Sequence, residues 1–131
     1  MHQIEHVGLT SNQVYDFIRD GFVKVEVGFS AALAKQCRDE LWADIGLSPD
    51  EPDKWVHPVI RVGFKSSPPF IEAANTSRLQ KAYNQLVGEG RWLAPAGLGT
   101  FPIRFPSPES PGDDGWHVDM SFGTDNPDFM E

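Results

Sequence analysis

The sequence holds a single cysteine among its 131 residues, and this scarcity excludes two kinds of structure. Cys37 alone can form no disulfide within the chain and cannot build a cysteine-rich zinc site. The sequence also has no apolar run near the roughly 18 residues that a membrane-spanning helix needs. Its first six residues have neither the basic start nor the apolar stretch of a secretion signal. We therefore expect a cytoplasmic protein that has no membrane partner.

Basic residues are scarce as well, with 11 Lys and Arg against 19 Asp and Glu and a formal net charge of −8. Nucleic-acid binding depends on basic side chains that neutralise phosphates, so we expect no nucleic-acid partner. The stretch from Phe105 to Glu131 contains acidic residues but neither Lys nor Arg. It is either a solvated acidic tail or a segment that meets a cation, which would be a metal or basic residues from outside this chain.

Hydrophobic residues make up 40% of the chain, which is enough for a packed core, and the length suits one domain. We predict a single domain over 1–131. Residues 1–92 are expected to be mainly helical with one early strand. Residues 93–131 are expected to supply the first strands of a sheet. Prolines and glycines exclude a long helix in the part of this range that ends at Gly112. The predicted class is α+β.

Apolar spacing and capping residues predict four helices. They are Ser11–Asp20, capped by Ser11 or Asn12; about Ala31–Ile45, capped by Ser30; a helix that begins at Ser67 and the Pro68-Pro69 pair; and a helix capped by Thr76 that runs through Val87. The alternative for the last two is one broken helix. The second helix has an apolar stripe of Leu33, Cys37, Leu41 and Ile45. Cys37 is therefore interpreted as a small core residue rather than a nucleophile.

Alternating or β-branched composition predicts four strands. They are Phe22–Val27; Trp55–Phe64, which Pro58 confines to an edge or an irregular segment; Gly99–Phe105, interrupted at Pro102; and Trp116–Phe122.

The last of these strands carries the pattern His117-x-Asp119. Side chains two residues apart in a strand point to the same face, so the imidazole and the carboxylate are expected to project together. An imidazole and a carboxylate are the two ligand types of the two-histidine, one-carboxylate iron site, which leaves metal positions open for cosubstrate and oxygen. The pattern also arises by chance as a surface histidine beside a loop aspartate. The pattern follows a Pro- and Gly-rich loop and lies beside aromatics such as Trp116 that could wall a pocket. This context favours the metal site.

Three features together resemble the phytanoyl-CoA dioxygenase family of iron(II)/2-oxoglutarate-dependent oxygenases. The first helix runs into Asp20-Gly21-Phe22-Val23-Lys24-Val25, and a long amphipathic helix follows directly. The block from Arg104-Phe105-Pro106 through Gly115-Trp116-His117-Val118-Asp119-Met120-Ser121-Phe122 is similar to the family's W-H-x-D strand. The resemblance covers about residues 12–123.

The resemblance implies N-terminal helices packed on the opening strands of a double-stranded β-helix (a jelly-roll, cupin-like core), which is incomplete in this chain. It implies iron(II) bound by His117 and Asp119, with 2-oxoglutarate chelating the metal as cosubstrate. The reaction would oxidise 2-oxoglutarate to succinate and carbon dioxide and hydroxylate a small organic substrate. Arg104, the last basic residue, could bind the anionic cosubstrate or a substrate carboxylate, with a surface ion pair as the alternative.

The sequence departs from the family after Asp119, where it has no further His or Arg. The family places its second histidine ligand and the arginine that anchors 2-oxoglutarate in that region. We therefore expect this chain to be the N-terminal part of a longer oxygenase and to be inactive alone. His57 is expected to be a structural or surface residue rather than the missing ligand. The alternatives are a non-catalytic binding or assembly domain that self-associates through open sheet edges, and a simple cupin-like metal binder that takes a ligand from elsewhere.

Overall fold

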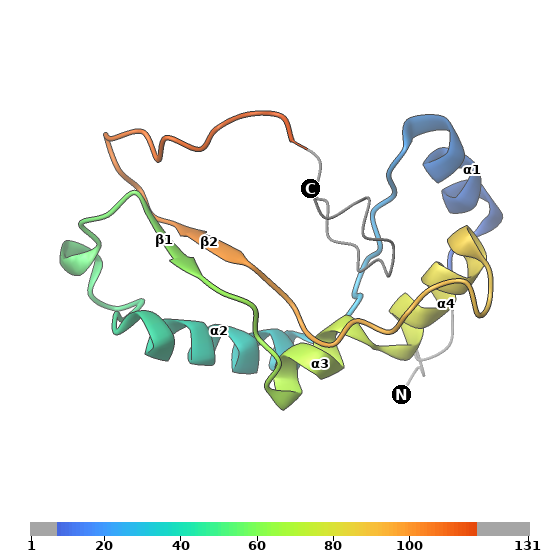
Figure 1. The fold of residues 1–131 in the computed structure, drawn as a ribbon, viewed down its shortest axis with the longest axis horizontal. Helices are drawn as coiled ribbons and strands as arrows, with labels where there is room; N and C mark the ends of the chain where they lie inside the picture. Colours follow the sequence, from blue (N-terminus) through green and yellow to red (C-terminus); the bar gives the residue numbers. More distant parts are fainter. Residues whose placement is uncertain (1–7, 118–131) are drawn as a thin grey trace, which may run out of the picture.

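The computed structural model of the protein describes residues 8–117 and has the predicted α+β class. Figure 1 shows α2 and the two strands at one end, α1 and α4 at the other, and α3 between them. In chain order the elements are α1 (Ser11–Asp20), α2 (Ala31–Ile45), a 3-10 turn (Pro52–Lys54), β1 (Val59–Val62), α3 (Pro68–Ala74), α4 (Ser77–Val87) and β2 (Phe101–Arg104). No helix of the described part is both long and apolar enough to cross a membrane.

The predicted bounds of α1 are confirmed, but the predicted cap is wrong. Thr10 caps this helix instead of Ser11 or Asn12. The Thr10 hydroxyl accepts a hydrogen bond from the Gln13 backbone N–H at 3.2 Å, and the Gln13 side chain accepts one from the Thr10 N–H at 2.9 Å. This reciprocal pair is a capping box, for which Thr-x-x-Gln is the sequence signature.

The bounds predicted for the second and fourth helices are confirmed. Ser30 caps α2 by accepting from the Leu33 N–H at 3.1 Å, and Gly46 ends it in the left-handed conformation with φ of 67°. Thr76 caps α4, and α3 begins at Pro68 as predicted. On the predicted stripe of α2, Leu33 is buried and Cys37 is partly buried.

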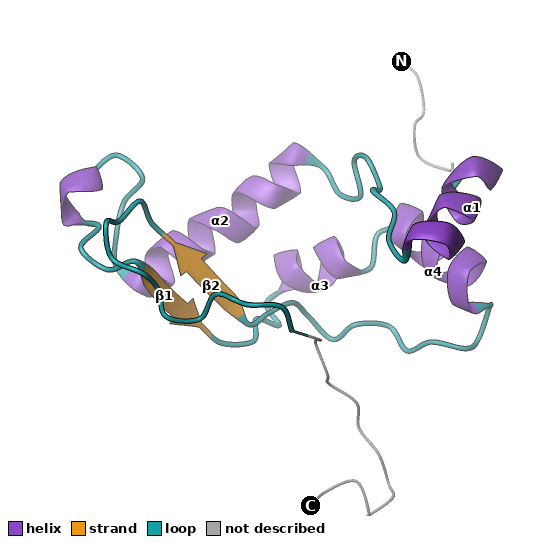
Figure 2. Ribbon diagram, turned by 90° about the horizontal axis from the view of Figure 1, so that it is seen from above, coloured by secondary structure: helices purple, strands orange, loops and turns teal. Residues whose placement is uncertain are grey.

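The two strands pair antiparallel (Figure 2), with Val59 opposite Arg104 and Val62 opposite Phe101. Each lies within a predicted strand. The interruption predicted at Pro102 is wrong, because this proline lies within β2 opposite Arg61. In the two-stranded sheet of the described residues, each strand pairs along one edge and leaves the other edge open. Proline is tolerated at an open edge, because its missing N–H is not needed there for strand pairing.

The strand predicted over Phe22–Val27 does not form within the described part of the chain. Its side chains alternate as far as Glu26, with Val23 and Val25 partly buried and Lys24 and Glu26 exposed, but Val27 is exposed as well. Alternation sets which residues face inward, whereas a strand also needs a neighbour for its backbone hydrogen bonds. The contact found here is a hydrogen bond from the Gln13 side chain to the Lys24 carbonyl, at 3.3 Å.

The core joins α2 and α3 to one face of the sheet. Phe70 of α3 is fully buried, and its ring meets the Phe101 ring edge-on with centroids 5.5 Å apart. A second aromatic cluster holds the C-terminal half of α2 to the sheet. It consists of Trp42, Trp55 and Phe105, with centroid distances of 5.5–6.1 Å.

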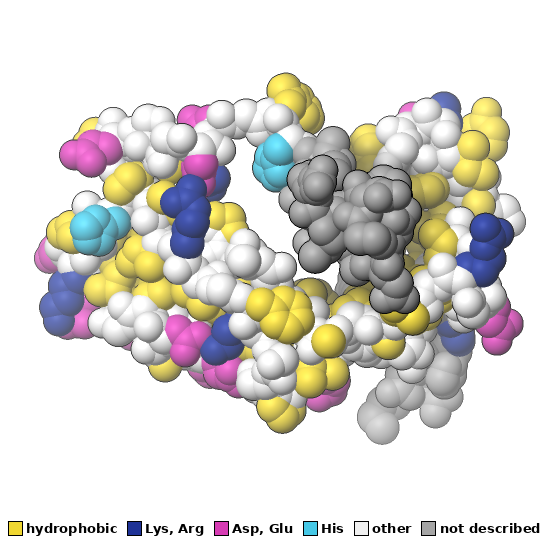
Figure 3. Space-filling view, in the orientation of Figure 1, with side chains coloured by type: hydrophobic (Ala, Val, Ile, Leu, Met, Phe, Trp, Pro, Cys, Tyr) yellow, Lys and Arg dark blue, Asp and Glu magenta, His cyan; other side chains and the backbone are white. Residues whose placement is uncertain are grey.

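The other end of the molecule has few buried contacts. The Gln85 side chain bonds both the N–H and the C=O of Leu9, which ties the start of α1 to α4. No side chain of α1 itself is buried, and Ile18 and Phe22 are more than 70% exposed. Figure 3 shows hydrophobic side chains at the surface over both ends of the molecule. The described elements therefore leave apolar surface that they do not cover.

Candidate functional site

His117 lies at the end of the segment 105–117, which leaves β2 and runs along the opposite side of the strands from α2 (Figure 1). Its side chain is exposed, and its Nδ1 lies 3.2 Å from the carbonyl oxygen of Gly115. A carbonyl oxygen can only accept, so a hydrogen bond forms at this distance in the tautomer that carries the proton on Nδ1. In the neutral ring Nε2 then carries the lone pair, which is the tautomer of a histidine that ligates a metal through Nε2.

The strand predicted over Trp116–Phe122 is wrong for its first two residues. Trp116 and His117 belong to no strand, and Trp116 is fully exposed, so it does not wall a pocket. No neighbouring backbone pairs with these two residues in the described sheet, which explains the absence of a strand. Asp119 lies outside the described residues, and its expected projection beside His117 stays a prediction.

Arg104, the predicted cosubstrate ligand, forms an ion pair within the chain. Its Nη1 lies 2.8 Å from Oδ1 of Asp113, and Nη2 of Arg61 bonds Oδ2 of the same carboxylate. The two arginines lower the pKa of the Asp113 carboxyl, mainly through the hydrogen bond from Arg104. The surface ion pair expected as the alternative role is therefore present. The binding of 2-oxoglutarate by Arg104 stays a prediction.

Asp113 was not among the predicted site residues. The feature of the sequence that pointed toward Asp113 was the absence of basic residues after Arg104, because it suggested that the acidic stretch meets a cation. The partners of Asp113 are basic residues, but they come from β1 and β2 of this chain rather than from outside it. Strand pairing brings Arg61 to this position, and that pairing was not predicted.

The described residues contain no cluster of further metal-ligating side chains. Within residues 8–117, no group of three His, Cys, Asp or Glu side chains is placed to hold a metal ion. His57 is exposed, as expected for a surface residue. Of the two predicted metal ligands, His117 is therefore the one that lies among the described residues.

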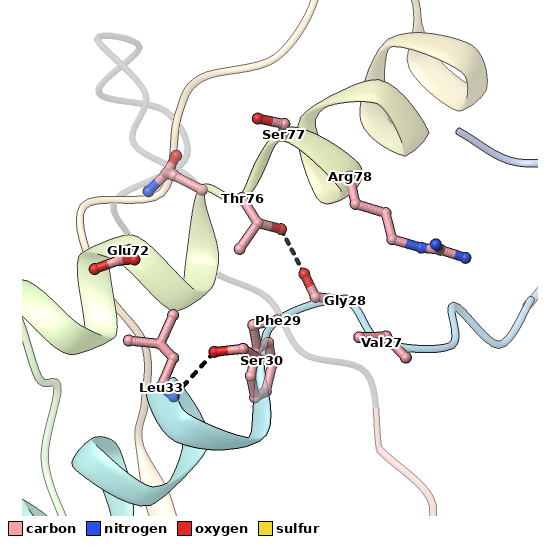
Figure 4. A pocket seen from close by; sticks show the side chains of 10 residues that line it. Val27, Gly28, Phe29, Ser30, Leu33, Glu72, Thr76, Ser77 and Arg78 are labelled. Carbon is pink, nitrogen blue, oxygen red and sulfur yellow. Dashed lines mark hydrogen bonds between the residues drawn. The ribbon is translucent and has the colours of Figure 1, made fainter. Parts of the chain in front are cut away.

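A separate pocket of about 570 Å³ lies where the N-terminus of α2 meets the junction of α3 and α4. Figure 4 shows the Thr76 hydroxyl, which donates to the Gly28 carbonyl at 2.5 Å, in the middle of this pocket. Glu72 and Arg78 lie on opposite sides of that hydrogen bond. None of the predicted site residues lines the pocket.

Comparisons with protein families, curated proteins and solved structures find no match to this chain. The resemblance to the phytanoyl-CoA dioxygenase family therefore stays a prediction from the sequence motifs.

Proposed function

We propose that this chain is part of a non-haem iron(II)/2-oxoglutarate-dependent oxygenase that hydroxylates small organic substrates. In this proposal His117 and Asp119 bind the iron. A second histidine and an arginine that anchors 2-oxoglutarate come from sequence that this chain does not contain. In the same proposal, the helices and the β1–β2 pair are the N-terminal helices and the first strands of a jelly-roll core.

The observation that carries the proposal is the hydrogen bond between Nδ1 of His117 and the Gly115 carbonyl. A metal-ligating histidine almost always donates its second ring N–H to a carbonyl or carboxylate, which fixes the ring and the tautomer. His117 has this arrangement, and the carboxylate of Asp119 follows two residues later in the sequence. The open edges of the β1–β2 sheet also agree with a core that needs further strands.

Bound iron would supply the activation of oxygen in the completed site. The task of His117 is then to offer Nε2 in a fixed orientation, and the task of Asp119 is to offer a carboxylate oxygen. Two protein ligands leave most positions of the metal to water. We therefore expect weak metal binding by this chain and no turnover of 2-oxoglutarate.

The experiment that tests this proposal is a titration of the 131-residue chain with manganese(II), which accepts the same nitrogen and oxygen ligands as iron(II). Electron paramagnetic resonance measures the free ion at each step. We expect His117→Ala to weaken binding at least about tenfold, because even outer partners of metal ligands contribute 10–100-fold. His57→Ala is the matched control, since it removes another exposed histidine, and it should bind like the wild type. Equal affinity of His117→Ala and wild type would refute the proposed site.

A second candidate function is a non-catalytic assembly domain, favoured by the uncovered apolar side chains and the open sheet edges. Ile18, Phe22 and Leu93 are 72–93% exposed, and association would remove such apolar side chains from water. Sedimentation velocity over a range of protein concentrations separates the candidates. Self-association without manganese(II) binding favours assembly, and a monomer that binds manganese(II) through His117 favours the oxygenase.

A further inference from the structure

The pocket beside Thr76 is formed by segments that lie far apart in the sequence. Residues 27–30, which lead into α2, form one wall, and the end of α3 with the start of α4 forms the other. The hydrogen bond from the Thr76 hydroxyl to the Gly28 carbonyl joins the two walls. The pocket volume of about 570 Å³ lies in the range of pockets that hold small molecules.

Two side chains of opposite charge line this pocket, Glu72 of α3 and Arg78 of α4. Neither forms an ion pair with the described residues. They lie on opposite sides of the hydrogen bond between Thr76 and Gly28 (Figure 4), so they do not pair with each other either. The pocket can therefore bind an anionic group near Arg78 and a cationic group near Glu72.

Two unpaired polar atoms belong to the same wall of the pocket. Among the described residues, the enclosed side-chain polar atoms without a hydrogen-bond partner are Oδ1 of Asn75 and Nε of Arg78. Both residues line the pocket. Enclosed polar atoms are normally paired, because an unpaired one loses its hydrogen bonds to water and gains nothing in return. An unpaired acceptor and an unpaired donor beside one pocket favour a ligand that itself brings both a donor and an acceptor.

The rest of the lining includes apolar side chains. Val27 and Phe29 are exposed, and Leu33 is buried at the first turn of α2. Val27 lies on the Arg78 side of the hydrogen bond between Thr76 and Gly28, and Leu33 lies on the Glu72 side (Figure 4). A ligand with an apolar group would remove part of this surface from water.

We propose that this pocket binds a small zwitterion with an apolar side group, of which an apolar amino acid is the simplest example. Arg78 pairs with the ligand carboxylate, because a guanidinium offers a carboxylate two parallel N–H donors. Glu72 pairs with the ligand ammonium, and Val27 and Phe29 contact the apolar group. Such binding requires neither a metal nor any residue of the predicted metal site.

The test is a ¹⁵N chemical-shift titration of the 131-residue chain with L-phenylalanine, which carries both charges and an aromatic side group. Two analogues each lack one charge, since 3-phenylpropanoate has no ammonium and 2-phenylethylamine has no carboxylate. Arg78→Gln and Glu72→Gln each remove one charge from the pocket. Arg38→Gln is the matched control, because Arg38 is an exposed helical arginine that does not line the pocket.

We expect L-phenylalanine to shift the amide signals of residues 27–33 and 72–78 and to bind the wild type and Arg38→Gln equally. Loss of one charge, from the ligand or from the pocket, should weaken binding about tenfold, as is usual for a hydrogen bond to a charged group. Glu72→Gln should leave the affinity for 3-phenylpropanoate unchanged, because that ligand has no ammonium to pair.

Three results would overturn the proposal. The first is the absence of saturable shifts at these residues when L-phenylalanine is added to the wild type. The second is equal binding of L-phenylalanine and 3-phenylpropanoate, which would indicate a site for anions in general. The third is unchanged affinity of Arg78→Gln for L-phenylalanine. The comparison of the three ligands uses the wild-type chain alone, so it decides the question even if a variant unfolds.

Discussion

The Phe70→Ala substitution probes the contact that joins α3 to the sheet. The Phe70 side chain is fully buried, packs edge-on against Phe101, and has the Lys65 ammonium 5.6 Å from its ring centroid. Truncation of a buried phenylalanine to alanine costs about 3–5 kcal/mol, from lost transfer free energy and the cavity left behind. Loss of the ring contact and the cation–π contact acts in the same direction.

This cost is large because few side chains are buried among residues 8–117. At about 0.05 kcal/mol per residue, the lower end of the usual range, 131 residues give a free energy of unfolding near about 7 kcal/mol. A loss of about 4 kcal/mol removes more than half of it. With a urea dependence of about 2 kcal/mol per molar, the unfolding midpoint falls by about 2 M.

The assay is urea unfolding followed by circular dichroism. The matched control is Phe22→Ala, because Phe22 is 72% exposed and its truncation should change the free energy of unfolding by less than about 0.5 kcal/mol. Similar costs for the two substitutions would refute the assignment of Phe70 to the core and of Phe22 to the surface.

Two further predictions concern reactivity. Partial burial is the largest cause that raises the pKa of the Cys37 thiol, so at pH 8 its thiolate fraction is below that of a free cysteine. Alkylation by iodoacetamide, followed by mass spectrometry, should be slower than for an unstructured cysteine peptide, and an equal or faster rate would contradict its placement on α2. Incubation of the 131-residue chain with iron(II), 2-oxoglutarate and oxygen should give no succinate above background. Succinate that depends on His117 would show that two ligands from this chain suffice.

The sequence predicted the helices well because their signals are local. Ser30 and Gly46 delimit α2, and the capping and apolar residues that define α4 lie within the helix or beside it. The cap of α1 was missed although Thr10 and Gln13 form a recognisable capping box, so this error lay in the interpretation rather than in the sequence.

Strands were predicted less well because their partners are distant in the sequence. Strand-like composition occurs in Phe22–Val27, which finds no partner among the described residues, and in the segment that includes β1, which pairs with β2 about 40 residues later. Nothing local distinguishes the two. Pairing also brings Arg61 beside Arg104, which is why the Asp113 bridge could not be predicted from spacing.

The candidate metal site was predicted from the residue types in its motif, a histidine and an aspartate two residues apart. The sequence predicts His117 and Asp119 as a ligand pair, but the contact of His117 Nδ1 with the Gly115 carbonyl depends on the backbone turn there. The exposure of Trp116 likewise depends on where the segment runs after β2. These features follow from tertiary structure and are absent from the motif.

The central claim is that His117 and Asp119 bind the same metal ion, and a double-mutant cycle on manganese(II) affinity tests it most directly. His117→Ala, Asp119→Ala and the double variant are titrated beside the wild-type chain. Two ligands of one ion are strongly coupled, so we predict that each single substitution weakens binding at least about tenfold and that the double variant loses less than the sum of the two losses. Single substitutions that leave the affinity unchanged, or losses that add independently, would contradict the claim.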